Sequence, residues 1–145
     1  MINKETGNIQ LLEVELSKNL TLQQFKDSKL YGRVSSKLPN QATFLLRPIE
    51  IEGHYYVFTL YFNNDNILFF VQFRIVPDSK SLTWKSFNSA KELDCLRLHK
   101  LLLEKDLGGN YKSINGRIEY NFPWGQISSA QNPHTSVAQV SIRYQ

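Results

Sequence analysis

Two apolar runs in the middle of the chain, His54 to Phe62 and Ile67 to Val76, alternate with the two-residue period of β-strands. The polar tetrad Asn63 to Asn66 joins them, so the pattern predicts a β-hairpin at the centre of the core. One face of this hairpin is expected to carry Tyr56, Phe58, Leu60, Phe62, Ile67, Phe69, Val71, Phe73 and Ile75. The opposite face also holds large apolar side chains, so it is either partly covered or a recognition surface.

Further strands are predicted on both sides of the hairpin. Asn8 to Leu16 has the pattern of an edge strand whose glutamates face water. Thr43 to Ile51 contains Pro48, which indicates an edge position or a bulge. Arg117 to Trp124 and Ala138 to Tyr144 also alternate, and each is bounded by turn residues.

Two helices carry start and stop signals. Thr21 and Gln24 form a capping-box pattern that predicts a short helix from Leu22 to about Asp27. Ser89 and Glu92 repeat the pattern before a longer helix that ends at about Leu107, where a glycine pair follows. One arc of the longer helix is expected to pack on the sheet and consists of Cys95, Leu96, His99, Leu102, Leu103 and Leu107.

The order of elements is therefore strand, helix, three strands, helix, two strands. Hairpin connections between most strands predict an α+β fold, with an antiparallel sheet of about five to six strands and two helices packed on one face. The 145 residues fit one domain that spans the whole chain, 1–145. Ser28 to Gln41 has no periodicity and is expected to be a surface loop with a possible binding role.

The charge balance changes this picture little. The formal net charge is +4, but the cations are spread over every predicted element instead of forming a phosphate-binding stripe. They include Arg33, Lys37, Arg47, Arg74, Lys85, Arg97, Lys112, Arg117 and Arg143. The excess of positive charge favours an acidic or neutral partner over a cationic one.

The sequence contains no recognisable targeting or membrane segment, and Cys95 is its single cysteine. An internal disulfide is excluded, and nothing points to an oxidising compartment. No apolar run approaches the length of a membrane span. These observations predict a cytoplasmic protein that does not contact a membrane.

Candidate catalytic groups have simpler interpretations. His54, His99 and His134 lie far apart and show no metal-ligand spacing. Cys95 and His99 are one helical turn apart, but inside the packing arc they are expected to be an inert thiol and a core histidine bonded to a backbone carbonyl or a tyrosine. We therefore predict no enzymatic activity, no cofactor and no metal.

The second face of the central hairpin is the candidate binding surface. Its proposed binding residues are Tyr55, Val57, Tyr61, Phe70 and Arg74. These aromatic side chains could stack nucleic-acid bases or hold a small ligand, although the sequence lacks the known RNA-recognition signature. If a second subunit covers them, they form a homodimer interface instead.

The second half of the chain resembles small bacterial domains of unassigned chemistry. The resemblance rests on Trp84 before a helix, Glu92 and His99 within it, the FPWGQISS stretch that begins at Phe122, and a final strand ending in Arg143-Tyr144. Such domains are similar in size and architecture to toxin-immunity proteins. The resemblance implies a non-catalytic protein-binding domain, most concretely a bacterial immunity protein that neutralises a toxin by steric occlusion. The alternative is a nucleic-acid or small-ligand binding module that uses the aromatic face of the sheet.

Overall fold

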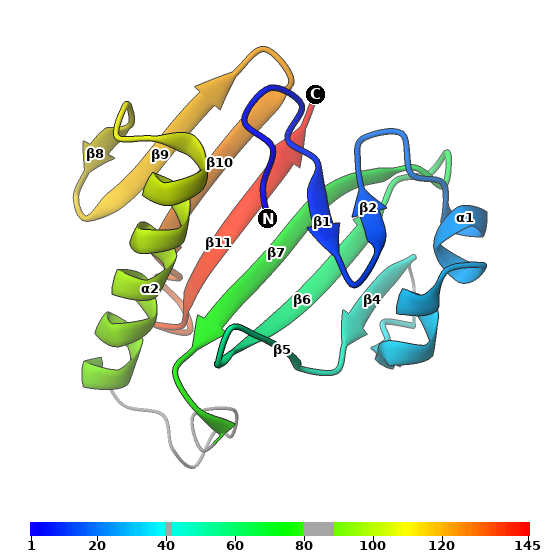
Figure 1. Ribbon diagram of the computed structural model, residues 1–145, viewed down its shortest axis with the longest axis horizontal. Coiled ribbons are helices and arrows are strands. Elements are labelled where there is room, and N and C mark those ends of the chain that lie inside the picture. Colours follow the sequence, from blue (N-terminus) through cyan, green and yellow to red (C-terminus); the bar gives the residue numbers. More distant parts are fainter. Residues whose placement is uncertain (40–41, 80–88) are drawn as a thin grey trace.

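The protein is built mainly from antiparallel β-strands, as a computed structural model of residues 1–39, 42–79 and 89–145 shows (Figure 1). The elements are β1 (Ile9–Leu11), β2 (Val14–Leu16), α1 (Leu22–Lys26), a 3-10 helix η1 (Lys29–Arg33), β3 (Val34–Lys37), β4 (Thr43–Leu46), β5 (Ile49–Ile51), β6 (His54–Phe62), β7 (Leu68–Val76), α2 (Ser89–Leu107), β8 (Lys112–Ile114), β9 (Arg117–Phe122), β10 (Gly125–Gln131) and β11 (Ala138–Tyr144). The α+β class and the antiparallel sheet agree with the sequence pattern. The number and order of strands do not.

Nine strands form one antiparallel sheet in the order β3-β4-β6-β7-β11-β10-β9-β8, and β5 pairs with β6 beside β4. The predicted central hairpin is present as β6 and β7, with Phe58 opposite Phe73. Pro48 lies between β4 and β5, so the single strand expected from Thr43 to Ile51 is broken into two short ones. This break is consistent with the missing backbone N–H of proline.

A β-bulge between Tyr61 and Phe62 shifts the register at the start of β7. Leu68 therefore takes the core position and is 1% exposed. Ile67 and Phe69, which simple alternation assigned to the core, are half-buried. The sequence prediction was wrong at these positions because a bulge inserts one residue and reverses the facing of those beyond it.

The segment from Asn8 to Leu16 is not an edge strand of the main sheet. It turns at Leu12 and Glu13, both at positive φ, and forms a separate two-stranded hairpin, β1–β2. The buried positions change from odd numbers in β1 to even numbers in β2. A two-residue turn accounts for that change of parity, which a continuous strand would not.

Three further segments were misassigned. The expected loop from Ser28 to Gln41 contains η1 and the edge strand β3, while its residues 40–41 lie outside the described part. β8 and β10 were not predicted as strands. β3 and β8 are short, largely exposed edge strands, so backbone pairing defines them and no apolar alternation marks them. The predicted segment with Trp84 and Phe87 also lies outside the described residues.

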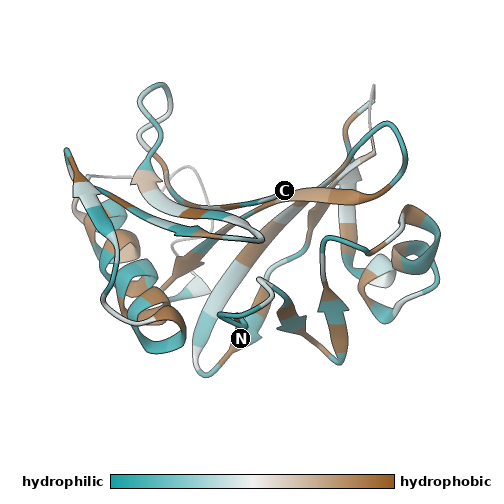
Figure 2. Ribbon diagram, turned by 90° about the horizontal axis from the view of Figure 1, so that it is seen from above, coloured by the Kyte–Doolittle hydropathy of each residue, from teal (hydrophilic) through white to brown (hydrophobic). Residues whose placement is uncertain are grey.

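The helices lie on one side of the main sheet, as predicted. Figure 2 shows α1, the β1–β2 hairpin and α2 below the sheet, and no described element covers the side above it. The core on the covered side includes Phe25, Phe44, Phe58 and Phe73. The capping box of Thr21 and Gln24 is present at the start of α1.

The α2 helix fills an opening between β7 and β11. The pairing of these strands ends at Phe73 and Val140, and in the same register Ile75 and Ala138 would be the next hydrogen-bonding pair. Instead, the Ile75 N–H donates to His99 Nε2 at 2.8 Å, and the Ala138 N–H donates to Glu92 Oε1 at 3.1 Å. Two α2 side chains thus replace the backbone acceptors that the ladder would supply. Glu92, expected to cap its helix, joins the helix to the sheet.

A close backbone approach at Gly125 gives a test of the β10–β11 pairing. A Cβ atom on this residue would lie 2.1 Å from the carbonyl oxygen of Arg143. We expect Gly125→Ala to lower the free energy of unfolding by about 2 kcal/mol or more, because the strands would have to separate. Gly109→Ala is the control, since a Cβ there meets no atom within 4 Å. Urea unfolding should show almost no loss for the control, and equal stability of the two variants would contradict this account.

Candidate binding surface

The uncovered side of the sheet carries one continuous set of side chains, which we call the open face. It consists of the outward residues at the centre of β4, β6, β7 and β11, which are Leu45, Val57, Thr59, Tyr61, Phe70, Gln72, Ser141 and Arg143. The strand registers align these residues in rows across the sheet. One row runs Tyr61, Phe70, Arg143, and the next runs Leu45, Thr59, Gln72, Ser141.

Contacts between neighbouring strands hold the side chains of the open face in place. The rings of Tyr61 and Phe70 have centroids 5.1 Å apart, and the Arg143 guanidinium carbon lies 4.8 Å from the Phe70 centroid. The Tyr61 hydroxyl donates to Gln72 Oε1 at 2.8 Å, and Gln72 Nε2 donates to Ser141 Oγ at 3.5 Å. The surface is therefore ordered before any partner binds, which reduces the entropy lost on binding.

The structure brings some of the predicted binding residues together and separates others. Tyr61 and Phe70 are in contact at the centre of the open face, and Val57 lies on the same face, four residues before Tyr61 in β6. Tyr55 is farther along β6, where it packs against the cluster that contains Cys95. The Arg74 guanidinium is bonded to the buried Glu92 carboxylate, with Nη2 at 2.7 Å from Oε2. Arg74 thus holds α2 on the sheet.

Sequence reasoning missed five of the eight residues of the open face, which are Leu45, Thr59, Gln72, Ser141 and Arg143. Each occupies an outward position in a predicted strand, so the alternation marked its orientation. The pairing of β11 with β7 was the missing information. These strands are separated by more than 60 positions in the chain, and their periodicity contains nothing that specifies the partner strand.

The open face is suited to recognition more than to chemistry. Burial raises the pKa of Tyr61, so its hydroxyl stays protonated and able to donate its hydrogen bond. Aromatic, amide and guanidinium groups of this kind are common where proteins contact proteins. Base stacking fits less well, because Arg143 already lies over the Phe70 ring and Arg74 is engaged by Glu92.

The histidine and cysteine of α2 lie where a substrate cannot reach them. Cys95 and His99 are both 0% exposed, and burial raises the pKa of the Cys95 thiol. Burial, together with the positive charge of Arg74, lowers the pKa of His99 to about 3. Its ring is therefore neutral, with Nε2 accepting from Ile75 and the proton on Nδ1, which has no acceptor among the described residues. His99 is a core histidine, but its partner is a backbone N–H, where a carbonyl or tyrosine was expected.

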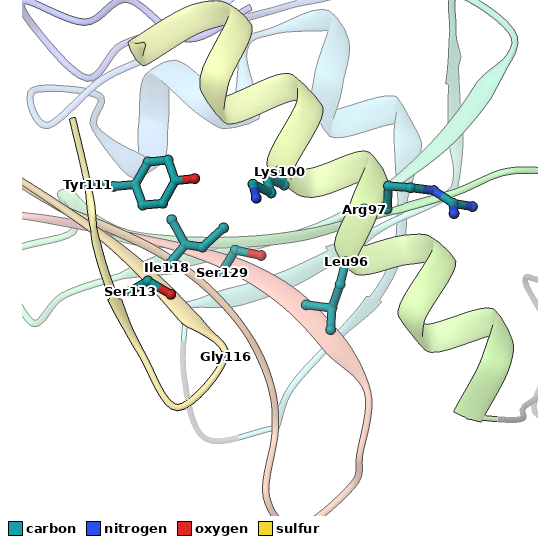
Figure 3. Close-up of a pocket in the computed structure, with 8 residues that line it drawn as sticks. All are labelled: Leu96, Arg97, Lys100, Tyr111, Ser113, Gly116, Ile118 and Ser129. Atoms are coloured by element: carbon teal, nitrogen blue, oxygen red, sulfur yellow. The ribbon is translucent and has the colours of Figure 1, made fainter. Parts of the chain in front are cut away.

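A cleft of 370 Å³ lies between α2 and the β8–β9 hairpin. Its walls are formed by Leu96, Arg97, Lys100, Tyr111, Ser113, Gly116, Ile118 and Ser129. Lys100 and Tyr111 extend toward each other, whereas Arg97 extends away (Figure 3). Both the Tyr111 hydroxyl and the Lys100 ammonium group interact with Glu104, at 3.0 and 3.8 Å. The Tyr111 hydroxyl and the Lys100 ammonium group are therefore already engaged within the protein.

In the described part of the chain, no helix is both long and apolar enough to cross a bilayer. Residues 1–39, 42–79 and 89–145 also contain no group of three His, Cys, Asp or Glu side chains arranged to hold a metal ion.

Comparison with solved structures identifies a similar fold. The chain matches a chain of the solved complex described as "Rhs1-CT in complex with cognate immunity protein RhsI1", with a TM-score of 0.59 and 14% sequence identity. The match covers 99% of this chain and 86% of that chain. No family model and no curated protein matches the sequence. The resemblance in size and architecture to toxin-immunity proteins, expected from the sequence, is thus confirmed at the level of the fold.

The lowered pKa of His99 predicts a dependence of stability on pH. As the pH falls below 6.5, the unfolded state takes up a proton on this residue before the folded state does. The free energy of unfolding should therefore decrease from pH 6.5 toward pH 3, by at most about 1.4 kcal/mol for each pH unit from this residue. The slope of the free energy of unfolding against pH is positive between pH 3 and pH 6.5, because the unfolded state binds more protons than the folded state there.

The His99→Gln variant isolates this contribution, since a glutamine oxygen can still accept the Ile75 N–H. Chemical denaturation between pH 4 and 7 should give a shallower slope for His99→Gln than for the wild-type protein. His134→Gln, which changes an exposed side chain, should keep the wild-type slope. Identical slopes for all three proteins would show that His99 does not couple folding to pH.

Proposed function

We propose that the protein is a non-catalytic binding domain of the immunity type, which neutralises a toxin by covering part of its surface. The observation that carries the proposal is an ordered, uncovered sheet face on a fold similar to one in a complex of Rhs1-CT with its cognate immunity protein. The burial of Cys95 and His99 supports a role without catalysis. A bacterial source and a cytoplasmic location stay predictions from the sequence.

The open face is the surface we assign to toxin binding. It combines large side chains of low flexibility, Tyr61 and Phe70, with the hydrogen-bonding groups of Thr59, Gln72 and Ser141. Such a surface excludes water from its apolar centre while its polar groups fix the orientation of the partner. A rigid sheet resists deformation, so the bound domain would stay fixed against the toxin. The volume of the domain would then block access to the part of the toxin surface that it covers.

Co-expression provides the direct test. The candidate toxin is the C-terminal domain of a large secreted protein encoded beside this gene, produced in a bacterial host with and without this chain. Protection of growth, together with a stable complex of the two purified proteins, would support the proposal. Growth arrest despite full expression of this chain would contradict it.

A homodimer that uses the open face is the competing arrangement. Light scattering after size-exclusion chromatography distinguishes the two. We expect a monomer that forms a one-to-one complex with the toxin domain. A stable dimer that Phe70→Ala converts to monomer would assign the open face to self-association instead.

Truncation of Phe70 tests which surface binds. Phe70→Ala should weaken toxin binding by about 30-fold or more, or about 2 kcal/mol, the loss typical of an aromatic residue at the centre of an interface. Leu101→Ala is the matched control, because Leu101 is 60% exposed on α2, which packs on the covered side of the sheet. Calorimetric titration measures both, and circular dichroism melting checks that each variant is folded. A larger loss for Leu101→Ala would move the interface to the helix.

A further inference from the structure

Arg143 differs from the other arginines in the described part of the chain because its guanidinium has no protein acceptor there. The others each bind a backbone carbonyl or a carboxylate: Arg33 the Pro48 oxygen, Arg47 the Gly32 oxygen, Arg74 Glu92, Arg97 Asp94, and Arg117 Glu119. The contact made by Arg143 is with the Phe70 ring. The hydrogen-bond donors of Arg143 are therefore available to a partner.

The Phe70 ring holds this guanidinium in position. Stacking at 4.8 Å restricts the planar group and reduces its hydration, while the N–H groups at its edge stay accessible. Tyr61 packs against the same ring from the other strand, at 5.1 Å. A long, flexible side chain is thus fixed before binding, which lowers the entropy that it would lose in a complex.

The charges around Arg143 leave it uncompensated. None of the eight residues of the open face is a carboxylate. Arg74, the next outward residue of β7 after Gln72, is neutralised by Glu92. Acidic side chains on this side of the sheet lie on other strands. Glu50 is on β5, and Glu119, two strands away on β9, is paired with Arg117. The centre of the open face therefore has one unpaired positive charge in a largely apolar and amide surrounding.

We propose that Arg143 is the anchor of the open face and binds a carboxylate on the surface of the protein partner. This inference rests on the proposed function. A guanidinium that is stacked and short of acceptors favours a planar carboxylate, which it can bind through two parallel hydrogen bonds. The polar groups of Gln72 and Ser141 lie in the adjacent row of the sheet and can pair with groups beside that carboxylate. A nucleic-acid backbone would require several free cations along a path, and the described open face offers one.

The test uses the same toxin domain and three variants of the full chain. Arg143→Gln removes the charge but keeps an aliphatic side chain with a planar amide beside Phe70. It should weaken binding by about 30-fold or more. Arg143→Lys keeps the charge without the two-pronged geometry and should recover part of the affinity. Arg117→Gln is the control, because Arg117 is an exposed arginine of β9 that is already paired with Glu119, and its affinity should stay within about twofold of the wild-type value. All three should melt at the wild-type temperature, because these side chains are exposed.

A double-mutant cycle identifies the acceptor. Aspartate-to-asparagine and glutamate-to-glutamine variants of the toxin domain are titrated against the wild-type protein and Arg143→Gln. One toxin variant should bind the wild-type protein more weakly than the unmodified toxin does. The same variant should bind Arg143→Gln almost as well as the unmodified toxin binds Arg143→Gln. That pattern would establish the carboxylate contact.

The outcomes separate this inference from the proposed function. If the wild-type protein and Arg143→Gln bind equally while Phe70→Ala binds weakly, Arg143 is not the anchor, but the open face still binds the toxin. If the wild-type protein does not bind the toxin domain, both proposals fail. If the protein binds a single-stranded oligonucleotide and Arg143→Gln abolishes that binding, the acceptor is a phosphate and the carboxylate proposal is overturned.

Discussion

The replacement of backbone acceptors by Glu92 and His99 is the interaction on which the architecture depends. β7 and β11 bring together two halves of the chain, one centred on the β6–β7 hairpin and one made of β8 to β11. Beyond Phe73 and Val140 their ladder ends, and the N–H groups of Ile75 and Ala138 would be left without acceptors in the interior. Such groups are costly when buried, so α2 must lie where its carboxylate and imidazole can receive them. This requirement places a nineteen-residue helix on the sheet.

The same cluster determines which charges remain on the open face. Glu92 is almost fully buried and needs a compensating cation, which Arg74 supplies. The Arg74 guanidinium is therefore not free to bind a partner, although the position of Arg74 in β7 faces outward. The positive charge of Arg74 also disfavours protonation of His99, which keeps that ring neutral and able to accept. Helix placement, histidine protonation and surface charge are therefore consequences of one group of residues.

The two sides of the sheet differ in the types of residue that they carry. The covered side uses phenylalanine, leucine and isoleucine to build the core with α1, α2 and the β1–β2 hairpin. The open face keeps aromatic residues as well, but it interleaves them with amides, hydroxyls and an arginine. This composition supports the binding role proposed above. The function proposed here needs no pocket, because occlusion requires only a rigid and specific surface.

The sequence by itself was sufficient for the class of fold, the central hairpin, both α-helices and the two-sided apolar character of the sheet. Local signals determine these features: the two-residue period, the capping box of Thr21 and Gln24, and the glycine after Leu107. Tyr61 and Phe70 were identified as binding candidates because both lie on the second face of the hairpin, whose alternation is local as well.

Tertiary structure decided the rest, because the remaining features depend on contacts between distant residues. Three of these features leave weak traces in the periodicity of the sequence. They are the bulge that puts Leu68 in the core in place of Phe69, the polar edge strands β3 and β8, and the folding of Asn8 to Leu16 as a separate hairpin. No local sequence signal specifies the pairing of β11 with β7. In the sequence Arg143 is therefore one of many dispersed cations, and only the sheet places it over Phe70. The roles of Arg74 and Arg143, alike in sequence, were separated by the position of one buried carboxylate, Glu92.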